Sequence, residues 1–210
     1  MVWHGPPGVT PWEIATSEPC RGWPVVRRRR TVLSAHPQEV TEHSVDIGPV
    51  IALHGFGDVR IIEPLVLEGP RARMTYGFAA RLPGIGTVDA RIHIAVDGLG
   101  FSMVETAAAG WRMRQLVVGT PIGVGETIVH SWTSLPSRGR SRIGRAAWHP
   151  VGAIVDRALA HTTIAQLARG ELMWSRRKYP NRPVIGASDG LVGRYRAWAQ
   201  QFYPDGAATR

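Results

Sequence analysis

The sequence predicts an α+β fold of the helix-grip type, in which an antiparallel sheet wraps around a long C-terminal helix and encloses an apolar cavity. Three observations support this prediction. Short apolar runs separated by turn residues fill residues 59–135, one of these runs alternates with a period of two, and the last third of the chain changes to helical spacing. Elements that are each apolar on one face must pack together, so the sheet and the helix are expected to share a core.

The predicted sheet begins with residues 25–33 and continues through the runs VRIIEPLVL, ARMTYGFAARL, TVDARIHIAV, GFSMVETAAA, WRMRQLVVG and ETIVHSWTSL. Glycine and proline separate these runs, as they do in antiparallel meanders. Within TVDARIHIAV, Ile92 and Ile94 alternate with Arg91 and His93. This alternation predicts that one face of the sheet is buried and that the other faces water.

Helices are predicted in three places. Residues His36–Asp46 carry a proline near the start and acidic residues early, where the helix dipole favours them. Residues 151–174 place apolar side chains at roughly helical spacing. Residues Ser188–Tyr203 form the last predicted helix, with Ser188 or Asp189 as its N-cap.

Composition indicates a globular protein, because 44% of the 210 residues are hydrophobic and 20% are charged. Residues 1–24, rich in proline, glycine and tryptophan, are predicted to form an extended arm, and residues 25–210 a single domain. No apolar run approaches the roughly 18 residues of a membrane helix. The N-terminus lacks the pattern of a signal peptide, so a cytoplasmic protein is expected.

The basic runs and the cysteine content narrow the choice of partners and cofactors. We interpret Arg27–Arg30 as a solvated strand face and Arg138–Arg145 as a loop, so nucleic-acid binding is not expected. Cys20 is the only cysteine. A [2Fe–2S] Rieske centre needs two cysteines and two histidines, so this chain is not expected to hold one.

Three stretches, in order along the chain, carry a resemblance to a known family: VWHGPPGVTPWE, HPQEVTEHSVDIGPVIALHG and ELMWSRRKYPNRPVIGASDGLVGRYRAWAQQFYP. Together they resemble the catalytic, C-terminal domain of Rieske non-heme iron oxygenases, in particular the oxygenase component of 3-ketosteroid 9α-hydroxylase and its sterol-desaturase relatives. The resemblance implies a START/Bet v 1-like helix-grip domain over residues 25–210. It also implies an apolar polycyclic or steroid-like substrate and assembly as a trimer.

The same resemblance implies a mononuclear iron held by two histidines and one carboxylate, with open positions for dioxygen. The family's iron helix reads Glu-Asn-x-x-Asp-x-x-His-x-x-x-x-His. In this chain Glu42 and Asp46 are kept, and His43 replaces the asparagine. The first ligand position holds Pro49, whose side chain cannot bind iron, and the second holds His54.

The third ligand of the family, an aspartate on a late helix, aligns with Gly170 in this chain. Glu171 could substitute for it only if the helix shifts by one residue. One ligand of three is therefore kept, and we expect neither a mononuclear iron nor any other cofactor.

The candidate catalytic residues are His54, Asp46 and His130. His54 and Asp46 could form an acid–base couple if the fold brings them together. The alternatives are a helix-terminal capping carboxylate for Asp46 and a buried or pocket-lining histidine for His54. Substrate-binding candidates are the aromatic and methionine residues of the predicted strands and of the late helix: Tyr76, Met103, Trp111, Met113, Trp132 and Trp174.

Three functions are compatible with these residues. The chain could be a repurposed pocket that binds a steroid-like or polyketide-like molecule and catalyses a metal-independent cyclisation, isomerisation or dehydration. It could be a non-catalytic accessory subunit of a complete Rieske oxygenase. It could also be an iron-dependent oxygenase that receives electrons from a separate Rieske protein.

Overall fold

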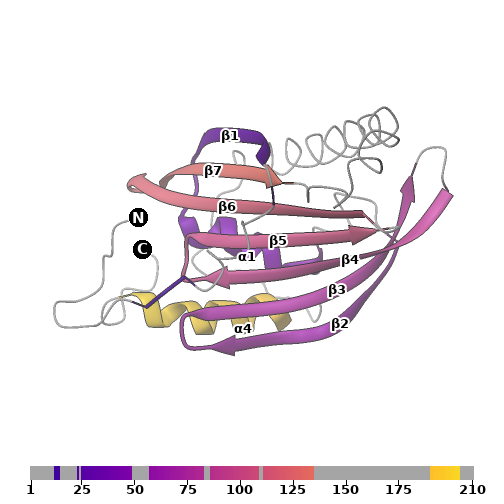
Figure 1. The fold of residues 1–210 in the computed structure, drawn as a ribbon. Helices are drawn as coiled ribbons and strands as arrows, with labels where there is room; N and C mark the ends of the chain where they lie inside the picture. The colour runs from indigo at the N-terminus through magenta and orange to yellow at the C-terminus, as the bar shows by residue number, and fades with distance from the viewer. Residues whose placement is uncertain are drawn as a thin grey trace.

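Seven antiparallel strands form one twisted sheet in the order β1-β7-β6-β5-β4-β3-β2, from β1 at the top of Figure 1 to β2 at the bottom. The computed structural model describes residues 12–14, 23, 25–48, 57–82, 86–108, 111–134 and 190–203. The strands are β1 (Val25–Leu33), β2 (Gly57–Glu68), β3 (Arg71–Leu82), β4 (Gly86–Asp97), β5 (Phe101–Ala108), β6 (Trp111–Gly123) and β7 (Glu126–Ser134). All of the strands expected from the apolar runs are present.

Strands β2 to β7 follow one another as a meander, and β1 joins the far edge by pairing with β7. The register between β3 and β4 is regular from Arg71↔Asp97 to Leu82↔Gly86. Gly98 in the β4–β5 turn has φ 63°, a value that glycine adopts without steric cost. The edge strand β2, in contrast, pairs with β3 through several register shifts, and such bulges discourage further pairing along an edge.

Two helices pack against the same side of the sheet, which we call the helix side. They are α1 (Pro37–Val45) and α4 (Gly190–Ala199), and α4 continues into a short 3-10 helix, Gln200–Phe202. Together they confirm the helices predicted at residues 36–46 and 188–203. The helix predicted at residues 151–174 lies outside the described residues.

The main core lies on the helix side, over β2, β3 and β4. Side chains from α1 and α4 meet the inward side chains of these strands there. The buried members of this cluster are Val45, Leu65, Ala72, Met74, Tyr76, Phe78, Ala90, Ile92, Ile94, Val96, Tyr195, Trp198 and Ala199. The alternation predicted for β4 holds at Ile92 and Ile94, which enter this core, and at Arg91, which stays exposed. Near the end of the strand, Ala95 and Asp97 are buried on the opposite side as well.

A second, smaller core joins the first half of α1 to the other end of the sheet. Leu33 of β1, Val40 of α1 and Val129 of β7 are buried together, and Val117 of β6 packs against them. Helix α1 consequently spans two regions, because its Val45 belongs to the main core and its Val40 to the small one.

The start of α1 shows why this segment is helical. His36 is its N-cap, and the ring Nδ1 accepts a hydrogen bond from the backbone N–H of Gln38 at 3.2 Å. The Glu39 carboxylate in turn accepts the backbone N–H of His36 at 2.9 Å. This reciprocal pair is a capping box, here with a histidine in the place usually taken by serine or threonine.

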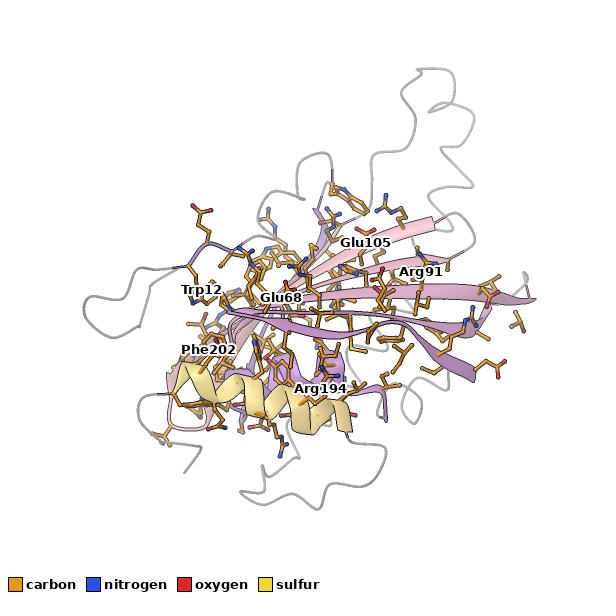
Figure 2. The ribbon with its side chains drawn as sticks, turned by 90° about the horizontal axis from the view of Figure 1, so that it is seen from below. Trp12, Glu68, Arg91, Glu105, Arg194 and Phe202 are labelled. Atoms are coloured by element: carbon orange, nitrogen blue, oxygen red, sulfur yellow. The ribbon has the colours of Figure 1, made fainter. Side chains whose placement is uncertain are left out.

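Described residues of the predicted N-terminal arm contact the sheet and the 3-10 helix that follows α4, and Arg71 Nη2 donates a hydrogen bond to the carbonyl oxygen of Glu13 at 3.2 Å. Trp12 lies 6.4 Å from Phe202, measured between ring centroids, and Figure 2 shows both residues at the same end of the molecule. Trp23 lies under the guanidinium of Arg114, 4.1 Å from ring centroid to Cζ. Among the described helices, none is long and apolar enough to cross a membrane.

The predicted α+β helix-grip fold is thus confirmed in its sheet and in the helices that pack on one side of it. The division of residues 1–24 and 25–210 into arm and domain stays a prediction.

Candidate functional site

The contact between α1 and α4 is held by a buried ion pair. Glu42 accepts two hydrogen bonds from Arg196, from Nε at 2.8 Å and from Nη2 at 2.7 Å. The Glu42 side chain is 7% exposed and the Arg196 side chain 19%. A bidentate pair shielded to this extent holds both side chains in one geometry, so both carboxylate oxygens of Glu42 are engaged.

Neutral hydrogen bonds extend this contact to the sheet. Thr41 Oγ1 lies 2.6 Å from the Tyr195 hydroxyl and 3.1 Å from the carbonyl oxygen of Leu99. At the other end of the helices, the Tyr203 hydroxyl donates to Gln38 Oε1 at 2.5 Å. Polar groups buried between the two helices are therefore paired with one another, as burial requires.

Helix α4 is also attached directly to the β2–β3 hairpin. Trp198 Nε1 donates to the carbonyl oxygen of Gly69 at 2.7 Å, and Arg194 Nη2 donates to that of Leu65 at 3.0 Å. These bonds seat α4 over the main core and leave β5, β6 and β7 uncovered by α4. Among the described elements, α1 is the helix that packs on the helix side of those three strands.

The helix side of β5, β6 and β7 carries a mixed set of side chains. Gln115 is flanked across the sheet by Val104 of β5 and Thr133 of β7. Along β6, Met113 precedes it and Val117 follows it on the same side. We call these five residues the β5–β7 wall. Within the described part of the chain, the Nε2 atom of Gln115 is buried without a hydrogen-bond partner.

Sequence reasoning missed Gln115. The available signal was an amide at the centre of the apolar run WRMRQLVVG, in phase with Met113 and Val117. Because a polar residue at an inward position is informative, this signal would have been sufficient to select it.

The predicted substrate-binding residues divide between the two sides of the sheet. Tyr76 and Met113 lie on the helix side, and the backbone of Trp111 is in register with Ala108 at the start of β6. Met103 and Trp132 lie on the opposite side, which we call the outer side. Trp174 lies outside the described residues.

The predicted catalytic residue His130 is also on the outer side. Its neighbour Val129 packs against α1 in the small core, and successive side chains of a strand point to opposite faces. The His130 ring stacks on Trp132 with centroids 5.7 Å apart. The structure therefore does not bring His130 together with Asp46, which follows α1 on the helix side.

The two sides differ in the ionisable groups they hold. On the helix side, burial raises the pKa of the Tyr76 phenol well above its usual value, so this group stays protonated. On the outer side, the Glu105 carboxylate accepts a hydrogen bond from Arg114 Nη2 at 2.7 Å and another from Arg112 Nε at 3.0 Å. Figure 2 shows Glu105 on the side of the sheet turned away from α4.

A second outer-side cluster joins β2, β3 and β4. Thr75 Oγ1 donates to Glu63 Oε2 and lies 2.9 Å from His93 Nδ1. The histidine and glutamate side chains are largely exposed, so this cluster is a solvated surface network rather than an enclosed site.

A family model, described as the 3-ketosteroid 9α-hydroxylase C-terminal domain, matches residues 2–203 of the chain. The chain belongs to this family. Its Rieske-oxygenase catalytic domain is the fold that the sequence motifs indicated.

Individual relatives are distant. Cholesterol 7-desaturase of Xenopus laevis is 20% identical over 223 residues, which cover 97% of this chain and 48% of the relative. The chain thus spans about half the length of this curated relative.

Solved structures share the fold. Dicamba monooxygenase bound to dicamba superimposes with a TM-score of 0.58 at 14% identity, covering 94% of this chain and 63% of that one. NdmA of Pseudomonas putida gives 0.55 at 12% identity, covering 91% and 53%. The Zhui aromatase/cyclase of Streptomyces sp. R1128 gives 0.50 at 13% identity, covering 72% and 93%. At these identities the similarity shows the fold alone.

Membership of the 3-ketosteroid 9α-hydroxylase C-terminal domain family implies a mononuclear iron, and the expectation that this chain holds none stays a prediction. Among the described residues, no three histidine, cysteine, aspartate or glutamate side chains come together. Glu42, the acid kept on the family's iron helix, has both oxygens bound to Arg196. Pro49 offers no donor at the first ligand position. Pro49 and His54 themselves lie outside the described residues, as does Gly170.

Asp46, also kept from the family's iron helix, is the C-cap residue of α1. Its Oδ1 accepts the backbone N–H of Gly48 at 3.2 Å, and its own N–H donates to the carbonyl oxygen of Glu42 at 3.1 Å. The side chain is half-buried. These contacts agree with the capping alternative, and its pairing with His54 stays a prediction.

Proposed function

We propose that this chain binds an apolar polycyclic molecule, steroid-like or polyketide-like, against the β5–β7 wall. We propose further that it converts the ligand by a metal-independent cyclisation, isomerisation or dehydration. The main observation in support of the proposal is the set of contacts that fix α1 against α4. In this chain the former iron helix is attached to α4 by the Glu42–Arg196 pair and by Thr41 with Tyr195, so its position needs no metal.

The binding part of the proposal is supported by the distribution of packing. Helix α4 seats on β2–β4, and the main core fills that half of the sheet. On β5–β7, Met113 and Val117 are only half-buried among the described residues. Apolar side chains beside a few polar groups are typical of small-molecule sites, and a flat ligand is the shape that a sheet face accommodates.

The catalytic part follows from what such a surface can do without a metal. Holding a flexible substrate in one reactive geometry removes much of the entropic barrier to ring closure or to loss of water. Asp46 at the end of α1 and His54 after it are the predicted proton-transfer groups. A buried, neutral Tyr76 can donate a hydrogen bond but cannot act as a phenolate base near neutral pH.

The proposal is tested by measuring iron and ligand binding on one preparation. The full chain is treated with a chelator, and binding of progesterone and of anthraquinone is followed by quenching of tryptophan fluorescence. We expect saturable binding that is unchanged by added Fe²⁺. Candidate substrates are then incubated with the chelated protein, and products are identified by mass spectrometry.

A matched variant makes the metal result decisive. Pro49→His combined with Gly170→Asp restores the ligand types of the family at the aligned positions. We expect about one iron per chain in this variant after reconstitution and far less in the unaltered protein. Stoichiometric iron in the unaltered protein, with turnover strictly dependent on it, would overturn the metal-independent proposal.

The accessory-subunit alternative predicts a different result in the same experiments. An accessory subunit would bind no small molecule by itself and would co-purify with a chain that carries a Rieske cluster. Light scattering of the purified protein then separates a self-assembled homotrimer, which a repurposed member of this family is expected to form, from a mixed complex.

A further inference from the structure

The large exposed aliphatic side chains of the described residues gather at the two edges of the sheet. Three lie on β2 at one edge, and three lie at the other edge, on β1 and where β6 turns into β7. They are Ile61, Ile62 and Val66 on β2, and Val32, Ile122 and Val124 at the far edge. Aliphatic groups that are exposed together call for an explanation, whereas scattered ones do not.

The turn between β6 and β7 presents the most exposed of these side chains. Val124 is fully exposed, and Ile122 and Val32 are each about half exposed. Val32 is in register with Ile128, which lies two residues after the start of β7, so Val32 is at the same end of the sheet as the turn. Figure 1 shows this turn extending past the end of β1 at the left. We call Val32, Ile122 and Val124 the apolar tip.

The strands that bear the apolar tip are strongly basic. Strand β1 contains four arginines and β6 contains two, whereas the acidic residues of β1, β6 and β7 amount to Glu126 alone. Arg112 and Arg114 of β6 have ion pairs with an acidic residue of β5. Arg28 and Arg30 of β1, in contrast, are exposed and make no ion pair among the described residues.

The β2 edge carries the opposite charge. Strand β2 contains three acidic residues and one arginine, and the side chains of Glu63 and Glu68 are largely exposed. The arginines at this edge, Arg60 and Arg73, have acidic partners in Asp89 and Glu68. A negatively charged surface is therefore attracted to the edge with the apolar tip rather than to the β2 edge.

The free arginines and the apolar tip form one continuous surface. Arg28, Arg30 and Val32 lie on the outer side of β1, because residues two apart in a strand point the same way. At a rise of about 3.3 Å per residue, the two arginines lie about 13 and 7 Å from Val32 along the strand. Aliphatic groups next to arginines match a bilayer with anionic headgroups, in which phosphates lie beside acyl chains.

We propose that this edge of the sheet docks on the surface of a bilayer that contains anionic lipids. The apolar tip enters the boundary between headgroups and acyl chains, and Arg28 and Arg30 contact the lipid phosphates. The arginines alone would suit a nucleic acid or an acidic protein as well, whereas the aliphatic tip gains free energy only where it leaves water. A lipid surface is the partner that uses both features. The inference goes beyond the proposed function and does not depend on it.

The test measures partitioning of the full chain onto vesicles by co-sedimentation. Vesicles of phosphatidylcholine alone are compared with vesicles in which about a third of the lipid is phosphatidylserine. One variant combines Arg28→Gln with Arg30→Gln, and the other combines Ile122→Ser with Val124→Ser.

Matched controls come from the β2 edge. Arg60→Gln with Arg73→Gln changes the net charge by the same amount as the β1 variant. Ile61→Ser with Val66→Ser removes two exposed aliphatic groups, of which Ile61 is as exposed as Ile122. These controls separate the chosen surface from the general effects of charge and apolarity.

We expect the unaltered chain to bind the anionic vesicles and to bind the neutral ones at least about tenfold more weakly. Arg28→Gln with Arg30→Gln should weaken binding to the anionic vesicles about thirtyfold, or about 2 kcal/mol. Ile122→Ser with Val124→Ser should weaken it about tenfold, because less aliphatic surface leaves water. Both controls should stay within about threefold of the unaltered chain.

Three results would overturn the inference. The first is an unaltered chain that binds neither kind of vesicle. The second is an equal loss in the β2-edge controls, which would assign binding to net charge alone. The third is a loss in the arginine variant without a loss in the serine variant, which would indicate a nucleic acid or an acidic protein as the partner.

A second measurement detects insertion directly and needs no weakened variant. Val124→Cys and its control Ile61→Cys are each made in a Cys20→Ser background, since Cys20 is the only native cysteine, and are labelled with a polarity-sensitive fluorophore. On anionic vesicles the emission should move to shorter wavelengths at position 124 and stay unchanged at position 61. An unshifted label at position 124 would show that the tip remains in water, and the inference would fail on that result alone.

Discussion

The two ends of the sheet are built differently on the helix side. Over β3 and β4, the inward side chains are apolar and buried in the main core with α1 and α4, as Met74 and Ile94 illustrate. Over β5, β6 and β7, the wall around Gln115 mixes amide, hydroxyl and half-buried apolar groups. One meander thus forms a closely packed core at one end. At the other end, the Nε2 atom of Gln115 makes no hydrogen bond among the described residues.

This difference shows which half of the sheet holds the helices in place. The closed half contains the contacts that hold α4 and the second half of α1, and none of them involves a metal ligand. We call the β5–β7 half, where Met113 and Val117 are half-buried, the open half.

The largest effect should come from deleting core volume in the closed half. Ile94→Ala is expected to lower the free energy of unfolding by about 2–5 kcal/mol, because Ile94 is buried and its cavity cannot collapse fully. Met113→Ala in the open half should cost less than half as much. Urea titrations measure both. Equal losses would mean that the two halves are packed alike and would break the comparison.

The next effect concerns the connection between the halves through α1. Glu42→Gln should lower the free energy of unfolding by about 3 kcal/mol, since it leaves Arg196 buried with a neutral partner. The double variant Glu42→Gln with Arg196→Met should recover part of this loss. A double-mutant cycle in urea gives the coupling between the two side chains. Additive losses would show that α1 does not depend on this pair.

A smaller, pH-dependent effect is expected at the start of α1. Burial lowers the pKa of His36 below its usual value of 6.5, and the neutral ring accepts the Gln38 N–H. The unfolded chain therefore takes up a proton first as the pH falls. The stabilisation is present above pH 6.5 and is lost as the pH falls through the folded-state pKa.

His36→Asn tests this pH dependence, because asparagine is an N-cap that does not titrate. The free energy of unfolding of the unaltered protein should fall between pH 7.5 and pH 5.5. We expect this fall to be about 1 kcal/mol smaller in the variant, which is the contribution of one N-cap. Free energies of unfolding at the two pH values measure it. An unchanged difference would assign the pH dependence to other groups.

The smallest effect is expected on the outer side, at Glu105. Burial alone would raise the pKa of Glu105, but hydrogen bonds from Arg112 and Arg114 and their charges lower it overall. Its contribution is present above the unfolded-state value of 4.5 and is lost as the pH falls below it. Glu105→Gln should reduce acid destabilisation by less than about 1 kcal/mol, because burial of the carboxylate offsets part of the stabilisation by the two arginines. Urea titrations at pH 3.5 and pH 7 check the difference.

Sequence reasoning predicted the strands, the two described helices and the family, because each depends on local periodicity and on motif order. It also predicted a set of catalytic and substrate-binding candidates, which the structure places on two different sides of the sheet. Met113 and Tyr76 share the helix side, whereas Met103, His130 and Trp132 lie on the outer side. Alternation shows which residues of one strand share a face. It does not show which residues of the next strand lie on that same face, because this depends on how the turn between the two strands sets their pairing register.

The sequence by itself determined the class of fold and the presence of a single cysteine, Cys20, since these depend on residue identity and order alone. That Pro49 stands at the first iron-ligand position is what the family resemblance implies. Only the tertiary structure decided that Glu42 is bound to Arg196 and that Gln115 is buried without a partner among the described residues. The physical reason is that both facts are contacts, made or missing, between segments far apart in the chain. They exist only after the helices and strands have packed.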